Sequence, residues 1–173
     1  MRILRPATGA AALVLAACTT LTATSAAHAT AVDLACTSTI APQYTPGLTL
    51  TPAAVTLNGP GTLDNCVGKP GVTSGTIAAQ GSSDSFSCTA GSLKVEGDIS
   101  WNDKTTSHFT FTALRVLQTN GSLVSVNSGT ITSGPFTGDT ITASYTLSNL
   151  PSACALPGGV TTATGTGVYT LSN

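Results

Sequence analysis

The chain has 173 residues, of which 41% are apolar, 8% charged and 5% aromatic. The charged fraction is far below the usual ~25%, yet the frequent apolar residues indicate a packed core rather than a disordered stalk. Six basic residues against seven acidic ones form no basic stripe, which argues against nucleic-acid binding.

The beginning of the chain has the features of an export signal. Two arginines lie near the start, residues 7–21 are mostly small and apolar, and Ala27-His28-Ala29 is a cleavage site of the A-x-A type. The apolar run is too short and too polar to cross a bilayer, and no second candidate span follows it. Cleavage after Ala29 makes Thr30 the first residue of the mature protein.

Cys18 offers a second interpretation of the same segment. The sequence Leu15-Ala16-Ala17-Cys18 matches the lipobox of bacterial lipoproteins, in which the cysteine is acylated and becomes the first residue. Such a lipid would anchor the protein to the outer face of a membrane. We favour cleavage after Ala29, which predicts a signal peptide over 1–29 and a single secreted, extracellular β domain over 30–173.

From residue 32 onward, apolar and polar residues alternate with a period of two, which indicates β-strands. Residues 32–40 form the first strand, and two short strands around Leu48 and Val55 are interrupted by Pro52. Asn58-Gly59-Pro60-Gly61 is expected to form a turn, and residues 80–84 a loop. Other strands are expected at 63–67, 72–79, 122–127, 129–133, 139–147 and 166–172.

The strongest strand pair flanks Asn102-Asp103-Lys104, which has the composition of a hairpin turn. Val95, Ile99 and Trp101 alternate with charged residues before the turn, and two phenylalanines alternate with polar residues after it. About nine or ten strands with frequent turn signals predict an all-β, antiparallel fold. It is either a β-sandwich, immunoglobulin-like or jelly-roll-like, or a closed barrel.

Four cysteines remain after the signal: Cys36, Cys66, Cys88 and Cys154. An even set of cysteines in an exported chain indicates two disulfides. The sequence contains no C-x-x-C pair, which argues against a zinc site or a redox site. We favour Cys36 with Cys66 and Cys88 with Cys154, because the hairpin region after Cys88 can then anchor the irregular loop at 151–159. Cys66 with Cys88 and Cys36 with Cys154 remain an alternative. Loop closure in the favoured pairing restricts the unfolded chain by about 3.5 and 4.3 kcal/mol.

Candidate catalytic residues are few. No G-x-S-x-G motif is present, and His108, the one histidine beyond the signal, is expected on an exposed strand face. Glu96 and Asp98 are two residues apart on a strand, hence about 7 Å apart, which suits paired glycosidase carboxylates. Their parity nevertheless places them in water, without the desolvating neighbour that marks a functional carboxylate. We therefore predict no enzyme.

Metal and ligand sites are equally scarce. Glu96, Asp98 and Asp103 do not complete a calcium ligand set, so no metal and no cofactor are predicted. Trp101, with Asn102 and Asp103, is the best binding-site candidate, because exposed aromatic rings stack on sugars. The parity that Trp101 shares with Ile99 favours a core position instead.

Several stretches resemble the small secreted proteins common in actinobacteria: the Ala27-His28-Ala29 signal end, the start Ala31-Val32-Asp33-Leu34-Ala35-Cys36, and Ile99-Ser100-Trp101-Asn102 ahead of an F-x-F strand. This resemblance implies export and an all-β fold and supplies no catalytic residue. The composition is also similar to that of the neocarzinostatin-type apoproteins, immunoglobulin-like carriers of small antibiotics. Their short cysteine-bounded hairpin is not matched, because Cys66 and Cys88 are too far apart.

Three functions follow from these observations, in order of preference. The first is a non-catalytic structural or surface-binding role at the cell envelope, with an extracellular or cell-surface partner. The second is a carrier of a small apolar ligand, which a deep apolar pocket would favour. The third is a hydrolase, which a cleft gathering His108 with a carboxylate and a Ser or Thr would favour.

The export signal predicts the mass of the mature protein. We expect intact mass spectrometry of the exported protein to show a chain that begins at Thr30 and lacks four hydrogens through two disulfides. A mass with an acylated Cys18 as first residue would establish the lipoprotein interpretation instead.

Overall fold

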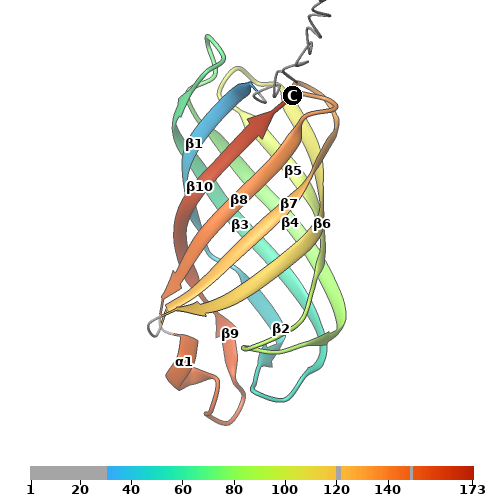
Figure 1. Cartoon of the computed structure of the whole chain (residues 1–173), viewed down its shortest axis with the longest axis vertical. Helices are drawn as coiled ribbons and strands as arrows, with labels where there is room; N and C mark the ends of the chain where they lie inside the picture. Colours follow the sequence, from blue (N-terminus) through green and yellow to red (C-terminus); the bar gives the residue numbers. More distant parts are fainter. Residues whose placement is uncertain (1–30, 120–121, 149) are drawn as a thin grey trace, which may run out of the picture.

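A computed structural model describes residues 31–119, 122–148 and 150–173. This part of the chain forms ten strands and one short helix (Figure 1). The strands are β1 (Val32–Ile40), β2 (Gln43–Leu48), β3 (Ala53–Val67), β4 (Gly75–Phe86), β5 (Lys94–Trp101), β6 (Thr106–Thr119), β7 (Ser122–Ser133), β8 (Thr140–Ser148), β9 (Val160–Thr162) and β10 (Thr164–Ser172). The helix, α1 (Leu150–Ala153), lies between β8 and β9.

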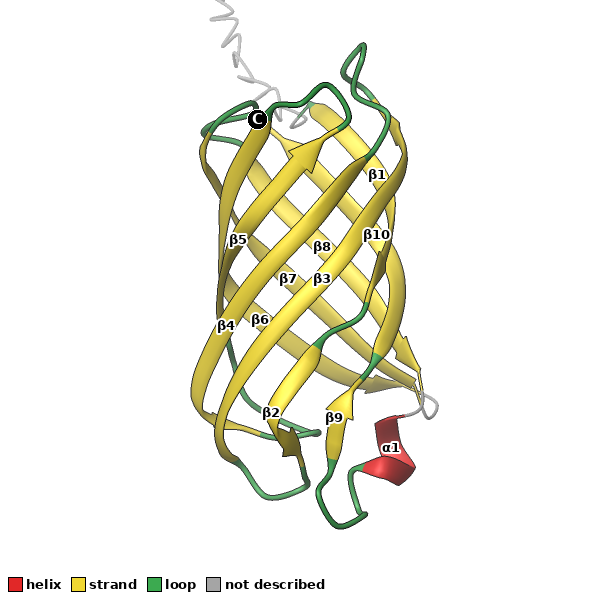
Figure 2. Cartoon of the chain, turned by 180° about the vertical axis from the view of Figure 1, so that it is seen from behind, coloured by secondary structure: helices red, strands yellow, loops and turns green. Residues whose placement is uncertain are grey.

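The strands form one antiparallel sheet that closes into a barrel. Strands β3 to β8 pair in chain order, β10 lies between β8 and β1, and β1 also pairs with β3. This ring has eight members, while β2 and β9 pair with each other at the lower end of Figure 1 (Figure 2 shows them from behind). The all-β, antiparallel prediction is confirmed in its closed-barrel form. No sandwich forms, because β1 is paired on both edges and leaves no seam between two sheets.

Alternation along the strands decides which side chains fill the barrel. In β5, Val95, Ile99 and Trp101 are buried while Glu96 and Asp98 are exposed, as their parity predicts. The upper half of the barrel is densely filled. Its fully buried apolar side chains are Leu34, Leu63, Ile99, Phe109, Ile131, Ile141 and Leu171.

Two segments with turn-like composition lie inside long strands, so the turn at residues 58–61 and the loop at 80–84 are wrong predictions. Pro60 lies opposite Ala78 of β4, and its carbonyl oxygen accepts the N–H of Ala41 at 2.9 Å. Pro60 thus lies where β1 gives way to β2. Pairing with strands on both sides outweighs the local turn propensity. Similarly, residues 122–133 form one strand rather than two.

The disulfides are Cys36–Cys66 and Cys88–Cys154, the pairing favoured from the sequence. Cys36–Cys66 joins β1 to β3, where Ala35 lies opposite Val67 and the barrel closes. Cys88–Cys154 joins the segment after β4 to the chain just after α1. One bond therefore cross-links the barrel wall, and the other ties two connections at the lower end.

Ala29, Thr30 and Cys18 lie outside the described residues, so cleavage and lipidation remain predictions. Within the part of the chain that the structure describes, no helix has the length and apolar character to cross a membrane.

Trp101 closes the upper end of the barrel as a core residue. Its side chain is only 3% exposed and its ring meets Phe136 edge-on at 5.6 Å. The indole Nε1–H donates to the Ser107 Oγ at 2.9 Å, and Ser107 donates in turn to the Pro135 carbonyl at 2.7 Å. A buried indole with its N–H paired favours a structural role.

Truncation of this side chain tests the core assignment. We expect Trp101→Ala to lower the free energy of unfolding by about 3 to 5 kcal/mol, because it leaves a cavity. Trp101→Phe is the matched control, since it keeps one aromatic ring in the core and should cost less than Trp101→Ala, although it loses the Nε1–H bond to Ser107 and part of the indole volume. Urea unfolding followed by circular dichroism measures both values. An unchanged stability in Trp101→Ala would contradict the core position.

Candidate functional site

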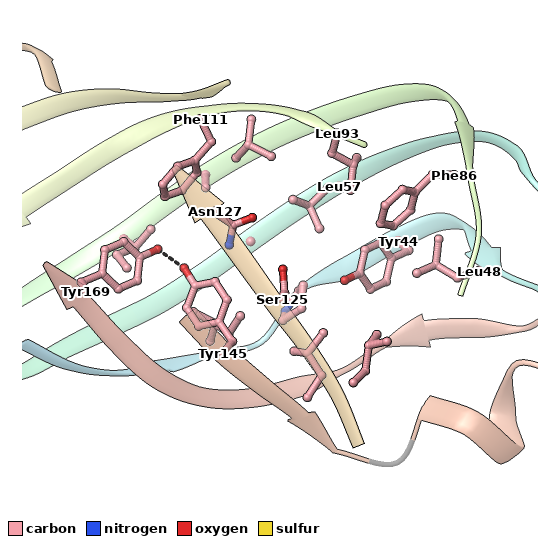
Figure 3. Close-up of a pocket in the computed structure, with 18 of the residues that line it drawn as sticks. Tyr44, Leu48, Leu57, Phe86, Leu93, Phe111, Ser125, Asn127, Tyr145 and Tyr169 are labelled. Atoms are coloured by element: carbon pink, nitrogen blue, oxygen red, sulfur yellow. Dashed lines mark hydrogen bonds between the residues drawn. The ribbon is translucent and has the colours of Figure 1, made fainter. Parts of the chain in front are cut away.

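An apolar cavity lies inside the lower half of the barrel (Figure 3). Its unfilled space measures about 740 Å³, part of it open to solvent, and the centre of a water molecule fits in about 80 Å³ of it. All eight members of the barrel ring contribute to its wall. The lining residues are Ile40, Pro42, Tyr44, Leu48, Leu57, Gly59, Ile77, Ala79, Phe86, Ser87, Leu93, Val95, Phe111, Leu123, Ser125, Asn127, Tyr145, Leu147 and Tyr169.

Small residues at inward-facing positions explain why this half of the barrel is not filled. Gly59, Ala79 and Ser125 point inward in the lower half of the barrel. In the upper half, large aliphatic or aromatic side chains point inward. A Cβ at Gly59 would lie 3.7 Å from the Ala79 Cβ and 3.9 Å from the Leu57 Cδ2, an ordinary contact distance. The space therefore results from side-chain size and not from a distortion of the backbone.

Three aromatic rings separate the cavity from the filled upper half. Phe111 lies 6.4 Å from Tyr169, and Tyr145 lies 5.6 Å from Tyr169, measured between ring centroids. The Tyr145 hydroxyl donates a hydrogen bond to the Tyr169 hydroxyl. The two phenols therefore satisfy part of each other's hydrogen bonding, and they form the inner end of the cavity (Figure 3).

The opposite end of the cavity is covered by residues 87–93, the connection from β4 to β5. Ser87 and Leu93 line the cavity, and Figure 1 shows this connection crossing the barrel end beside β2 and β9. The N–H of Cys88 donates to the Thr49 carbonyl at 2.9 Å, and its sulfur is bonded to Cys154. The cover is thus fastened to two neighbouring connections.

The cavity wall carries no formal charge. Its described lining residues include no Asp, Glu, Lys, Arg or His, and tyrosine is its one ordinarily titratable residue type. Burial raises the pKa of Tyr44 and of Tyr169 to about 12. Burial, followed by the proximity of Tyr169, raises the pKa of Tyr145 well above its usual value. All three phenols are therefore neutral across the physiological range.

Besides the tyrosine hydroxyls and Ser87, two polar side chains interrupt the apolar wall, and both come from β7. Ser125 and Asn127 are buried and point into the cavity (Figure 3). Sequence reasoning missed them, although a signal was present. They share the parity of Leu123 and Ile131, so they are polar residues at inward positions of a strand.

His108 and Asp98 meet, but on the outer wall. The His108 Nδ1 lies 2.8 Å from the Asp98 Oδ1, across the pairing of β5 with β6, and the side chains are 38% and 56% exposed. Glu96 also points outward. None of the three lines the cavity. The two side chains therefore lie on the solvent-facing side of their strands, as the alternation of the sequence predicts.

The sugar-binding candidates Trp101, Asn102 and Asp103 make structural contacts in and around the hairpin turn at the upper end of the barrel. Trp101 is buried, so its ring offers no face for stacking. The Asn102 Oδ1 accepts the N–H groups of Thr73 and Ser74, and the Asp103 carboxylate accepts the N–H and hydroxyl of Thr105. Asn102 and Asp103 thus stabilise connections between strands. Among the described residues, no three His, Cys, Asp or Glu side chains gather as a metal site.

No model of a known protein family, no curated protein and no solved structure matches the chain. The resemblance to small secreted actinobacterial proteins therefore remains a prediction.

The buried tyrosines predict a loss of stability at high pH. Because the folded-state pKa of Tyr44 and Tyr169 is about 12 against 10 for a free phenol, their contribution is complete below pH 10 and is lost as the pH rises towards 12. We expect the free energy of unfolding, measured with urea, to decrease in that window by about 1.4 kcal/mol per pH unit for each of the two tyrosines. In Tyr44→Phe, the slope of the free energy of unfolding against pH should be smaller by the amount that one tyrosine contributes. An equal slope in the variant would show that Tyr44 ionises freely.

Proposed function

We propose that this protein binds and carries a small, uncharged, mainly apolar molecule inside the barrel. The main support for this proposal is the cavity itself, which is bounded by all eight members of the barrel ring and is lined largely by aliphatic and aromatic side chains. An eight-stranded barrel has an interior just wide enough for its own side chains or for one small ligand. Here one half is filled with side chains and the other is not.

The dimensions of the cavity suit a molecule of one or two rings. A compact space with 80 Å³ for water centres has a full volume on the order of 300 Å³ once the ~1.4 Å water radius is added. That value is at the lower end of the range for small-molecule pockets. An apolar ligand of this size gains free energy by leaving water and by making dispersion contacts with the wall.

The other hypotheses have less support from the described residues. A hydrolase needs its base in a cleft with a nucleophile, whereas His108 and Asp98 lie on the solvated outer wall. A structural or partner-binding role at the cell envelope remains a prediction.

A cavity-filling substitution tests the proposal. Naphthalene serves as an uncharged probe, and we expect it to bind the disulfide-bonded protein with one site per chain, measured by fluorescence and calorimetry. Gly59→Leu places a branched side chain into the cavity at a position with room for a Cβ. We expect it to weaken naphthalene binding at least about ten-fold, because the added atoms occupy the ligand's space.

The matched control is Asn58→Leu, which places the same side chain one residue earlier, on the exposed outer face of β3. Its naphthalene affinity should equal that of the wild type. Absence of naphthalene binding to the wild type, or equal binding by Gly59→Leu and Asn58→Leu, would overturn the proposed function.

A further inference from the structure

Asn127 is buried in the cavity wall at an energetic disadvantage. The residue is only 3% exposed, and its Oδ1 has no hydrogen-bond partner among the described residues. A buried amide oxygen without a partner loses its hydration and gains nothing in exchange, so native proteins rarely retain one. An apolar residue at this inward position would be more stable. A role for the polar group in binding would explain its presence.

The cavity distinguishes Asn127 from the other unpartnered buried atoms. The described residues include two more, the Ser38 Oγ and the Asp139 Oδ2, and neither residue lines the cavity. The Asn127 side chain lies between Phe111 and the tyrosine pair and projects into the open space (Figure 3). Its unused acceptor therefore faces the volume that a ligand would fill.

Neighbouring groups do not supply the missing donor. The Tyr145 hydroxyl donates to Tyr169 and so uses its proton within the pair. Ser125 lies two residues before Asn127 on the same face of β7, and its hydroxyl also points into the cavity (Figure 3). One spot on the wall thus combines an amide and a hydroxyl, while the rest of the wall is mainly apolar.

We propose that the ligand of this cavity is a neutral, mainly apolar molecule with one hydrogen-bond donor, such as a ring hydroxyl, which donates to the Asn127 Oδ1. This inference rests on the proposed function and specifies its ligand class. A charged ligand is disfavoured, because the lining offers no countercharge and an ion would lose its hydration. A purely apolar ligand leaves the amide oxygen unpaired.

Matched probes separate these cases. Naphthalene has no polar group, naphthol adds a donor, the methyl ether of naphthol keeps the oxygen without the donor, and naphthoate is an anion. Each is titrated at neutral pH into the disulfide-bonded wild type, Asn127→Leu and Asn58→Leu. Asn58→Leu is the matched control, because it makes the same substitution on the exposed face of β3.

In the wild type we expect naphthol to bind about three- to ten-fold more tightly than naphthalene or the methyl ether, as one buried neutral hydrogen bond allows. Naphthoate should bind more than about a hundred-fold more weakly. In Asn127→Leu the preference for naphthol should disappear, naphthalene should bind at least as well, and the melting temperature should rise. Asn58→Leu should retain the wild-type preference. Asn127→Ala provides a second loss of the amide, should the larger side chain prevent folding.

The outcomes separate the inference from the proposed function. If naphthalene binds and Gly59→Leu excludes it, but naphthol has no advantage or keeps its advantage in both Asn127 variants, the ligand class is wrong and the carrier function remains. If naphthalene does not bind the wild type, or binds Gly59→Leu as well as Asn58→Leu, the carrier function is wrong and the inference with it.

Discussion

The barrel depends on the pairing of β1 with two neighbours, β10 on one side and β3 on the other. A sheet of this length would otherwise expose two edges with unpaired N–H and C=O groups. Closure satisfies those groups and creates an interior shielded from solvent. Cys36–Cys66 lies at this seam and links β1 to β3 covalently, so it restricts separation of the first strand from the ring.

Once the ring is closed, the size of the inward side chains decides what the interior can hold. Phe109, Ile99 and Ile131 fill one half, whereas Gly59 and Ala79 leave the other half open. The aromatic layer of Phe111, Tyr145 and Tyr169 forms the boundary between them. The packed core and the cavity thus occupy different halves of one barrel.

The lower end of the cavity is covered by a connection between strands rather than by a strand. Residues 87–93 lie across the barrel end, and Cys88–Cys154 holds them to the chain that follows α1. Hydrogen bonds within the segment add to this order, since the Ser87 hydroxyl donates to the Ala90 carbonyl and accepts the Ala90 N–H. A low-charge domain with a partly unfilled interior benefits from such cross-links, because an unfilled interior contributes less dispersion energy than a packed one.

The sequence by itself determined the local alternation: strand 32–40, the hairpin at Asn102-Asp103-Lys104, the buried parity of Trp101 and the exposed parity of His108 all follow from period-two patterning. It also favoured the observed disulfide pairs. Only the tertiary structure decided that the sheet closes, that residues 58–61 continue a strand, and that Asn127 faces an open cavity. The physical reason is that alternation reports which face of a strand is buried, whereas closure and empty volume depend on non-local pairing and on the summed sizes of side chains from eight strands.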